Sequence, residues 1–542
     1  MKTKTRRWAG ILFAAVGALL SVMVPQSRAE YGVTNIINGN TINYTGTWKV
    51  GANGSLNAQI ITNGGILAVV GEGIIGYSAI SSNNYAIVTG SGSLWNNSGK
   101  LYVGFYGSAN QLTIQSGVVS NSDGYIGTLA TASNNSVLVS GTGSLWNNGG
   151  YCVVGFYGSA NQLTIQSGGV VNSSDGFIGS STTASNNSVL VSGTGSLWNN
   201  AELCVGNFGS GNQLTIQSGG VVNSSDGFIG SSTNANNNSV LVSGTGSLWN
   251  NSGKLYVGNF GSSNQLTIQS GVVSNTYGYI GYGTNANNNC VLVSGTGSVW
   301  TNTGMLYVGY MGSTNRLVIA DGAVVWAPKS WLGYGGGRDN HILLCNGTLA
   351  GDVLMVNSDC GVSGWGMISG AVTNMGTLTA DGGALQFQGN VKNTGVLRAV
   401  NGAVLESYGP VVNDGVIDII YGNTNFHSTF INNGIVLTAD GDPDGDGMSN
   451  LHESLAGTSP TNSASCLRIT NIAREGDDVR ITWTAVGGKS YVVQTNSLLG
   501  GGYGDFSGVI YVPGTGESLT NYVHFGGATN NPALFYRIRL WP

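Results

Sequence analysis

Charged side chains are scarce in this sequence. Asp, Glu, Lys and Arg make up 8% of its 542 residues and there are four His, so acid–base catalysis has few candidate groups besides carboxylates. The 24 acidic residues outnumber the 19 Lys and Arg, which excludes the basic surface typical of nucleic-acid binding. We therefore expect no nucleic-acid partner and no catalytic residues, and we predict that the protein is not an enzyme.

Long apolar runs are absent after the first 25 residues, so the sequence predicts no later membrane-spanning helix. The N-terminus differs, because Lys2, Arg6 and Arg7 precede an apolar run that ends at Pro25. Small residues then stand before a cleavage site after Ala29. This pattern predicts a signal peptide over residues 1–29 and an exported product, extracellular or at the cell surface. An uncleaved N-terminal anchor is the alternative.

The six cysteines lack the C-x-x-C spacing of a metal or redox motif. Cys152, Cys204 and Cys290 lie in repeats whose other copies carry Val, Leu or Ser, which favours a role as small apolar core residues. Cys345 and Cys360 are close enough in sequence for a disulfide, and that pairing remains an alternative.

Glycine is abundant, with 90 residues, and it punctuates internal repeats. The block Ser-Gly-x-Gly-Ser-Leu-Trp-Asn-Asn recurs, with small variations, every 51 or 52 residues, with its tryptophan at Trp95, Trp146, Trp198, Trp249 and Trp300. A second block, Asn-Gln-Leu-Thr-Ile-Gln-Ser-Gly, lies between its copies, so the true unit is about 25 residues. Each unit holds three short alternating apolar runs closed by turn residues, which predicts three strands. Three strands per short repeat predict an all-β fold, a parallel β-helix.

Two side-chain types recur at fixed repeat positions. Asn at a constant position can stack on its copies, with its amide bonding along the axis. The recurring Trp favours core packing, with Val or Leu between successive copies. A sugar-stacking platform is the alternative, and it would require Tyr102, Trp146, Phe156 and their repeat equivalents to be exposed.

The repeat length divides the chain. We predict a β-helix with rungs of about 25 residues over 30–330 and a continuation with rungs of 19–20 residues over 331–437, where Asn-x-Gly recurs at Asn374, Asn393, Asn413 and Asn432. Residues 438–465 form a linker with a short helix. Residues 466–542, with more charge and longer alternating runs, are predicted as a small antiparallel β-sandwich with strands near 479–484, 491–495, 509–512, 522–525 and 535–540.

The repeated blocks resemble the autotransporter-associated β-strand repeats of bacterial surface proteins, over about residues 75–325. The resemblance implies a β-solenoid and carries no specific activity. The C-terminal segment resembles a fibronectin type III-like module through Ile-Thr-Trp, Gly-Lys-Ser-Tyr-Val-Val-Gln and Phe-Tyr-Arg-Ile-Arg-Leu.

Residues 442–453 carry the strongest chemical signal. Numbered as a twelve-residue loop, the segment has oxygen ligands at positions 1, 3, 5, 7, 9 and 12 and Gly at 6, the spacing of an EF-hand-type calcium loop. The predicted Ca2+ ligands are Asp442, Asp444, Asp446, the main-chain carbonyl of Met448, Asn450 and Glu453. The loop resembles those of dockerins and thrombospondin type 3 repeats, and a helix over 449–456 should follow it, ended by Gly457. An acidic turn without an ion is the alternative.

These features predict a secreted or cell-surface structural or adhesive protein with a calcium-stabilised joint. Its partners would be glycans, cell-surface or matrix components, or other copies of itself. The alternatives are a glycan-binding module and a polysaccharide-active β-helix enzyme, a lyase or glycoside hydrolase. For an enzyme, residues 337–341 are the only local acid–base cluster, and we interpret them as a loop at the change of rung size. We interpret Asp123, Asp175 and Asp226 as turn residues whose carboxylates bond nearby backbone.

Overall fold

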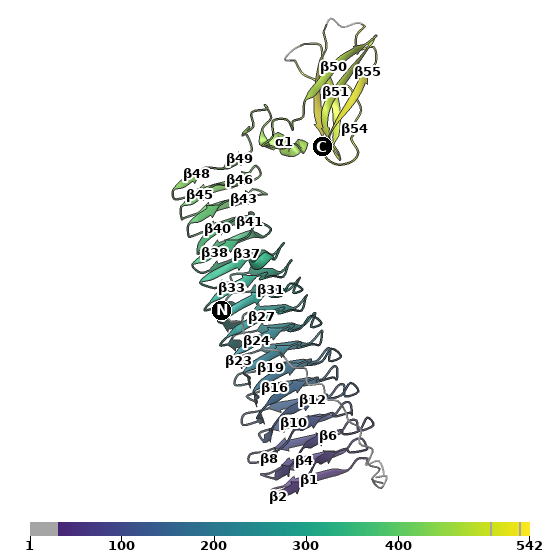
Figure 1. Ribbon diagram of the computed structural model, residues 1–542, viewed down its shortest axis with the longest axis vertical. Coiled ribbons are helices and arrows are strands. Elements are labelled where there is room, and N and C mark those ends of the chain that lie inside the picture. Colours follow the sequence, from purple (N-terminus) through teal and green to yellow (C-terminus); the bar gives the residue numbers. More distant parts are fainter. Residues whose placement is uncertain (1–30, 499–500, 530–532) are drawn as a thin grey trace.

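The computed structural model describes residues 31–498, 501–529 and 533–542, so the predicted signal peptide lies outside the described residues. The chain forms a long parallel β-solenoid followed by a small module of two antiparallel sheets (Figure 1). This confirms the predicted all-β fold class. No helix in the described part of the chain combines the length and apolarity that crossing a membrane requires.

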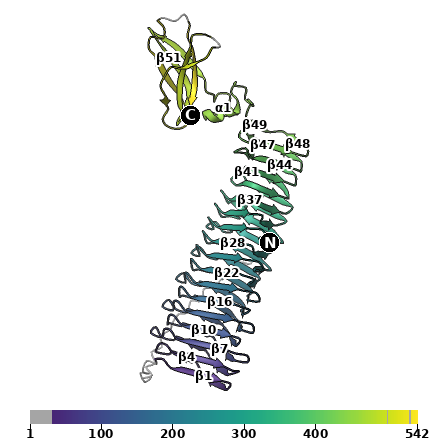
Figure 2. The same ribbon diagram turned by 180° about the vertical axis from the view of Figure 1, so that it is seen from behind.

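Each wide rung contributes three strands, as the repeats predict. One rung consists of β13 (Ser136–Ser140), β14 (Leu145–Asn148) and β15 (Tyr151–Val154). Each strand pairs in parallel with its equivalent in the next rung, which comprises β16 (Gln162–Gln166), β17 (Val170–Asn172) and β18 (Asp175–Ile178). The first and second strands of all rungs form sheet A, and the third strands form sheet B. Figure 2 shows the same stack from behind.

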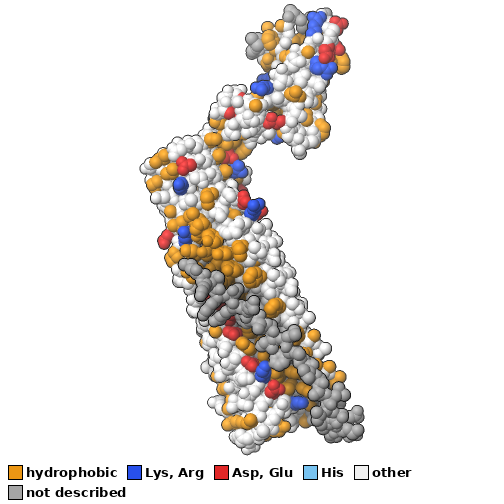
Figure 3. Space-filling model, viewed as in Figure 1, with side chains coloured by type: hydrophobic (Ala, Val, Ile, Leu, Met, Phe, Trp, Pro, Cys, Tyr) orange, Lys and Arg blue, Asp and Glu red, His pale blue; other side chains and the backbone are white. Residues whose placement is uncertain are grey.

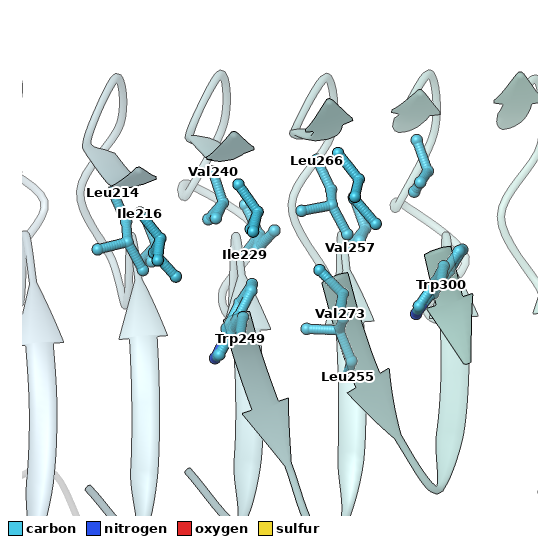
Figure 4. Close-up of a cluster of buried hydrophobic side chains, with 14 of the residues drawn as sticks. Leu214, Ile216, Ile229, Val240, Trp249, Leu255, Val257, Leu266, Val273 and Trp300 are labelled. Carbon is cyan, nitrogen blue, oxygen red and sulfur yellow. The ribbon is translucent and has the colours of Figure 1, made fainter. Parts of the chain in front are cut away.

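The core is one apolar column along the rod axis. Alternate residues of each strand point inward, and the inward rows of successive rungs pack on one another (Figure 4). Trp146 lies in register between Val119 and Val171, and all five repeat tryptophans are fully buried. The prediction of core packing for these residues is confirmed, so they form no sugar-stacking platform.

A row of buried asparagines joins the wide rungs. In each step the Oδ1 of one Asn accepts hydrogen bonds from the backbone N–H and the Nδ2 of the Asn one rung before it, for example at 2.9 and 3.1 Å from Asn161 to Asn187. The same pattern continues to Asn340. A glycine accompanies each step, because a Cβ on Gly155 would lie 2.2 Å from Nδ2 of Asn187. The predicted asparagine ladder is confirmed.

The rungs become narrower after β36 (Lys329–Leu332). The first and second strands merge into the long strands β37 (His341–Ala350), β39 (Gly361–Ile368) and β41 (Thr377–Phe387). The Asn row moves to the end of the third strand, where Asn374 Nδ2 donates to Asn393 Oδ1 at 2.8 Å and Asn393 to Asn413 at 2.7 Å. The solenoid ends with β49 (Ile435–Thr438).

The predicted short helix is present as α1 (Asn450–Ala456), with Ser449 as its N-cap and Gly457 in the left-handed conformation at its C-cap. The C-terminal module pairs β50 (Ile469–Glu475), β51 (Asp478–Val486) and β55 (Glu517–His524) in one sheet. Its second sheet has β52 (Ser490–Asn496), β53 (Gly504–Asp505), β54 (Ile510–Tyr511) and β56 (Phe535–Trp541). The two antiparallel sheets fit the predicted small sandwich. The sequence missed β50, because most of its side chains are exposed and it lacks an apolar alternation.

All six cysteines are free thiols, and Cys345 and Cys360 are not bridged. Cys152 and Cys204 are buried, as predicted for core residues, but Cys290 is only half-buried because it takes an outward-facing position of its strand. Cys360 and Cys466 are also buried.

Candidate metal centre

The predicted calcium loop begins just after β49 and runs into α1. Asp442 organises its first half, because Oδ1 accepts from the backbone N–H groups of Gly445 (2.9 Å) and Asp446 (3.2 Å) and Oδ2 accepts from Gly447 (3.0 Å). Gly447 has a φ of +93°, which few other residues adopt. This turn brings carboxylate oxygens of Asp442, Asp444 and Asp446 to within 4.8 Å of one another.

Met448 lies half-buried between these aspartates and the helix. Its backbone N–H donates to Asp446 Oδ1 at 2.8 Å, and its sulfur accepts from the backbone N–H of Leu467 at 3.2 Å. The predicted ligand of this residue, its carbonyl, belongs to the same loop.

The last two predicted ligands are fully buried on α1. Asn450 Nδ2 donates to the Thr438 carbonyl at 2.7 Å, which fixes the amide and leaves Asn450 Oδ1 without a partner. Glu453 Oε1 lies 3.5 Å from Thr458 Oγ1, and Glu453 Oε2 has no partner. Burial, together with the nearby charges of Asp446 and Asp444, raises the pKa of Glu453 to about 7.

Buried side-chain oxygens without hydrogen-bond partners indicate whether the loop residues fit a cation. Within the described residues, every buried carboxylate oxygen that lacks a hydrogen-bond partner belongs to this loop: Asp444 Oδ1 and Oδ2, Asp446 Oδ2 and Glu453 Oε2. Buried anionic oxygens without partners are costly, and a bound cation offsets that cost. Carboxylate and amide oxygens are the ligands that calcium prefers. The residues present therefore fit Ca2+.

The loop and α1 form hydrogen bonds with both the solenoid and the C-terminal module. On the solenoid side, Asn450 Nδ2 donates to the carbonyl of Thr438, the last residue of β49, at 2.7 Å, and Tyr421 Oη donates to Ser454 Oγ at 2.9 Å. On the side of the C-terminal module, Lys489 Nζ donates to the Leu455 carbonyl at 2.8 Å. The loop and α1 therefore contact both the solenoid and the C-terminal module.

Residues 339–341 of the acid–base cluster at 337–341 line a hollow of about 360 Å³ at the change of rung size. His341 Nε2 lies 2.7 Å from Ser363 Oγ, and Arg338 Nε lies 3.4 Å from Asp359 Oδ2. Burial and the charge of Arg316 lower the pKa of His341 below its usual range. In the part of the chain that the structure describes, no carboxylate is hydrogen-bonded to His341.

The three repeat aspartates bond backbone, but not in their own turns as the sequence suggested. Their Oδ1 atoms accept the backbone N–H at the start of the third strand of the next rung, at 2.9 Å from Asp123 to Tyr151 and 2.6 Å from Asp226 to Lys254. Asp175 bonds Glu202 in the same way. The carboxylates therefore join rungs, because stacking brings the next strand within reach.

The aromatic residues named for a sugar platform are mostly covered. Trp146 and Tyr102 are buried and Phe156 is half-buried. The exposed ring is instead that of the following residue, Tyr157. The sequence showed this recurrent aromatic position, but only the stacked structure separates the two neighbouring rings.

No family model matches this chain, and no curated protein matches it.

Proposed function

We propose that the chain is an exported structural or adhesive protein, in which a rigid β-solenoid is joined through a calcium-binding loop to a C-terminal module. The observation that carries the proposal is the loop with its unpaired buried oxygens, set between a continuous solenoid and a second folded unit. The solenoid supplies a stiff rod because each rung is paired with both neighbours along its sheets.

In this proposal Asp442, Asp444, Asp446, Asn450, Glu453 and the Met448 carbonyl hold Ca2+. The ion supplies positive charge that neutralises the buried carboxylates. The chain's own residues then transmit the effect, because Asn450 is bonded to Thr438 of β49 and α1 is bonded to Lys489. An ordered loop fixes the direction in which the module projects from the rod.

Export is supported by the sequence pattern of residues 1–29. A non-catalytic role is supported by the hollow at 337–341, where Asp359 pairs with Arg338 and His341 bonds a serine. The enzyme alternative is tested by substituting Asp339 and His341 to Ala in a polysaccharide-depolymerisation assay. Activity that these substitutions abolish would overturn the structural role.

The joint is tested by small-angle X-ray scattering of residues 30–542, with 5 mM CaCl2 or with EGTA. We expect calcium to narrow the distribution of overall dimensions. A Glu453→Gln variant should scatter in calcium as the unchanged protein does in EGTA. Identical scattering in both buffers, together with no calcium binding by calorimetry, would contradict the proposal. Fractionation of producing cells tests export, and retention in the cytoplasm would contradict it.

A further inference from the structure

One exposed aromatic residue recurs on the rod at every second rung. It lies in the corner after the third strand, between for example β9 (Leu101–Val103) and β10 (Gln111–Gln115). We call these residues the aromatic row: Tyr106, Tyr157, Phe208 and Phe260. Their exposed fractions are nearly equal, at 43, 42, 46 and 44%. The sequence repeat thus places four similar rings on one line along the axis.

The spacing of the row follows from the stacking. Rungs pair at about 4.8 Å, so rings on every second rung are about 9.6 Å apart. The corners of the intervening rungs carry small or aliphatic residues at this place, such as Ser181 and Thr182. An occupant that contacts all four rings must therefore be long, straight and periodic.

The corners hold the row rigidly. The glycine after each ring leaves no room for a side chain. A Cβ at that position would lie 2.0–2.1 Å from a carbonyl oxygen of the preceding corner; for Gly158 this is the Ala132 carbonyl. Thr131 and Thr183 donate to the carbonyls of Tyr106 and Tyr157 at 2.7 and 2.9 Å. A surface that is already ordered loses little entropy on binding.

The charge of the rod lies away from the row. All seven charged residues between positions 51 and 310 stand at or just before the start of a third strand, whereas the aromatic row follows the end of that strand: Glu72, Lys100, Asp123, Asp175, Glu202, Asp226 and Lys254. Figure 3 shows how sparse charged side chains are along the rod. Five of the seven are acidic, so the rod offers little positive charge to attract an anionic polymer.

We propose that the aromatic row binds a linear, uncharged, β-1,4-linked polysaccharide that lies along the rod. Such a chain presents the same sugar face at every second residue, and the apolar faces of sugar rings pack on aromatic side chains. Four weak contacts on one rigid line add by multivalency. This inference rests on the proposed adhesive function and names its ligand class.

The test is affinity electrophoresis of residues 30–542 in native gels with calcium. The gels contain hydroxyethylcellulose or glucomannan, with dextran and polygalacturonate as the coiled neutral and anionic comparisons. We expect retardation by the two β-1,4-linked polymers only. Replacing all four rings by Ala should weaken binding at least tenfold, and each single replacement should weaken it less. The matched controls Trp326→Ala and Trp365→Ala remove exposed rings of sheet A (37 and 39% exposed) and should leave binding unchanged.

Three results would overturn the inference: no retardation by either β-linked polymer, full binding by the four-ring variant, or equal loss in the sheet A controls. Light scattering on the same samples covers a fourth result. If the four-ring change turns a dimer into a monomer without glycan binding, the row is a contact between copies and the inference is wrong. Circular dichroism of the variant checks its fold. Calcium binding and scattering do not involve the row, so they test the proposed joint separately.

Discussion

The asparagine ladder of the rod and the acidic loop of the joint use side-chain oxygens in opposite ways. In the ladder, the Oδ1 of each buried Asn is bonded by the Asn of the neighbouring rung, as between Asn161 and Asn187. In the loop, Asp444, Asp446, Asn450 and Glu453 each keep a buried oxygen without a partner. In the ladder, the side-chain oxygen of an Asn in one repeat copy is hydrogen-bonded by the equivalent Asn of the neighbouring copy. The acidic loop occurs once in the chain, so its oxygens have no equivalent residues in a neighbouring copy to bond them.

The rod and the joint are stabilised by different interactions. The rod depends on packing and hydrogen bonds that the chain supplies, so its stability should not respond to calcium. The joint depends on a balance of buried charge, so it should respond to calcium and to pH.

The largest expected effect comes from the core of the rod. Trp146→Ala removes a fully buried indole and should lower the free energy of unfolding by about 3–5 kcal/mol in urea denaturation. The matched control Trp326→Ala, on an exposed ring, should change it by less than about 1 kcal/mol. Equal effects of the two substitutions would contradict the single apolar column.

The ladder should be the next most sensitive feature. Asn187→Ala leaves the backbone N–H of Asn161 buried without an acceptor and removes one of the two acceptors of Asn161 Nδ2, the other being the Ser159 carbonyl, so the free energy of unfolding should fall by about 2–4 kcal/mol. Asn96→Ala, on an exposed side chain of β8 (Leu94–Asn97), should change it by no more than about 0.5 kcal/mol. Neither variant should alter calcium affinity, which calorimetry checks.

Calcium affinity should depend on Glu453. Glu453→Gln removes a buried carboxylate charge and should weaken binding at least tenfold by calorimetry, or about 1.4 kcal/mol. The control Glu475→Gln, on an exposed residue of β50 paired with Arg480, should leave the affinity unchanged. An unchanged affinity in the first variant would show that the ion, if bound, does not use the helix.

The same carboxyl should make binding depend on pH. Without calcium its pKa is raised to about 7, so protons compete with calcium below that value. We expect about tenfold weaker binding at pH 6 than at pH 8. The folded state binds this proton more tightly than the unfolded chain does, so the calcium-free joint loses stability as pH rises from about 4.5 to 7. The thermal unfolding temperature of the calcium-free Glu453→Gln variant should lack this dependence on pH.

The smallest effect distinguishes two equivalent tryptophans. Trp146 Nε1 donates to Asn121 Oδ1 at 2.8 Å, whereas Trp198 Nε1 is buried without a partner. Replacing each by Phe should therefore cost about 1 kcal/mol more at Trp146 than at Trp198. Urea denaturation of both variants measures the difference, and the reverse order would contradict the hydrogen-bond assignment.

Much of the fold could be predicted from the sequence, because every repeat carries the same local pattern of apolar, Asn and turn residues. Alternation predicted the strands, the recurrent Asn predicted the ladder, and the capping residues around α1 predicted the helix. The metal-ligand set could also be predicted, because Asp442, Asp444 and Asp446 lie close together in the sequence. The first strand of the C-terminal module, β50, could not be predicted, because most of its side chains are exposed and it is held in place by pairing with β51.

The sequence by itself determined the repeat length, the three short strands of each rung and the order of ligands in the acidic loop. These depend on neighbours within about a dozen residues. Only the tertiary structure decided that Asp123 bonds the next rung, that Trp146 is buried while Tyr157 is exposed, and that Asn450 and Glu453 keep unpaired oxygens. In the rod, the reason is that stacking brings together residues about 25 positions apart, which sets burial and hydrogen bonding. In the joint, the reason is that Asn450 Nδ2 is held by the Thr438 carbonyl of β49 and Glu453 is buried on α1.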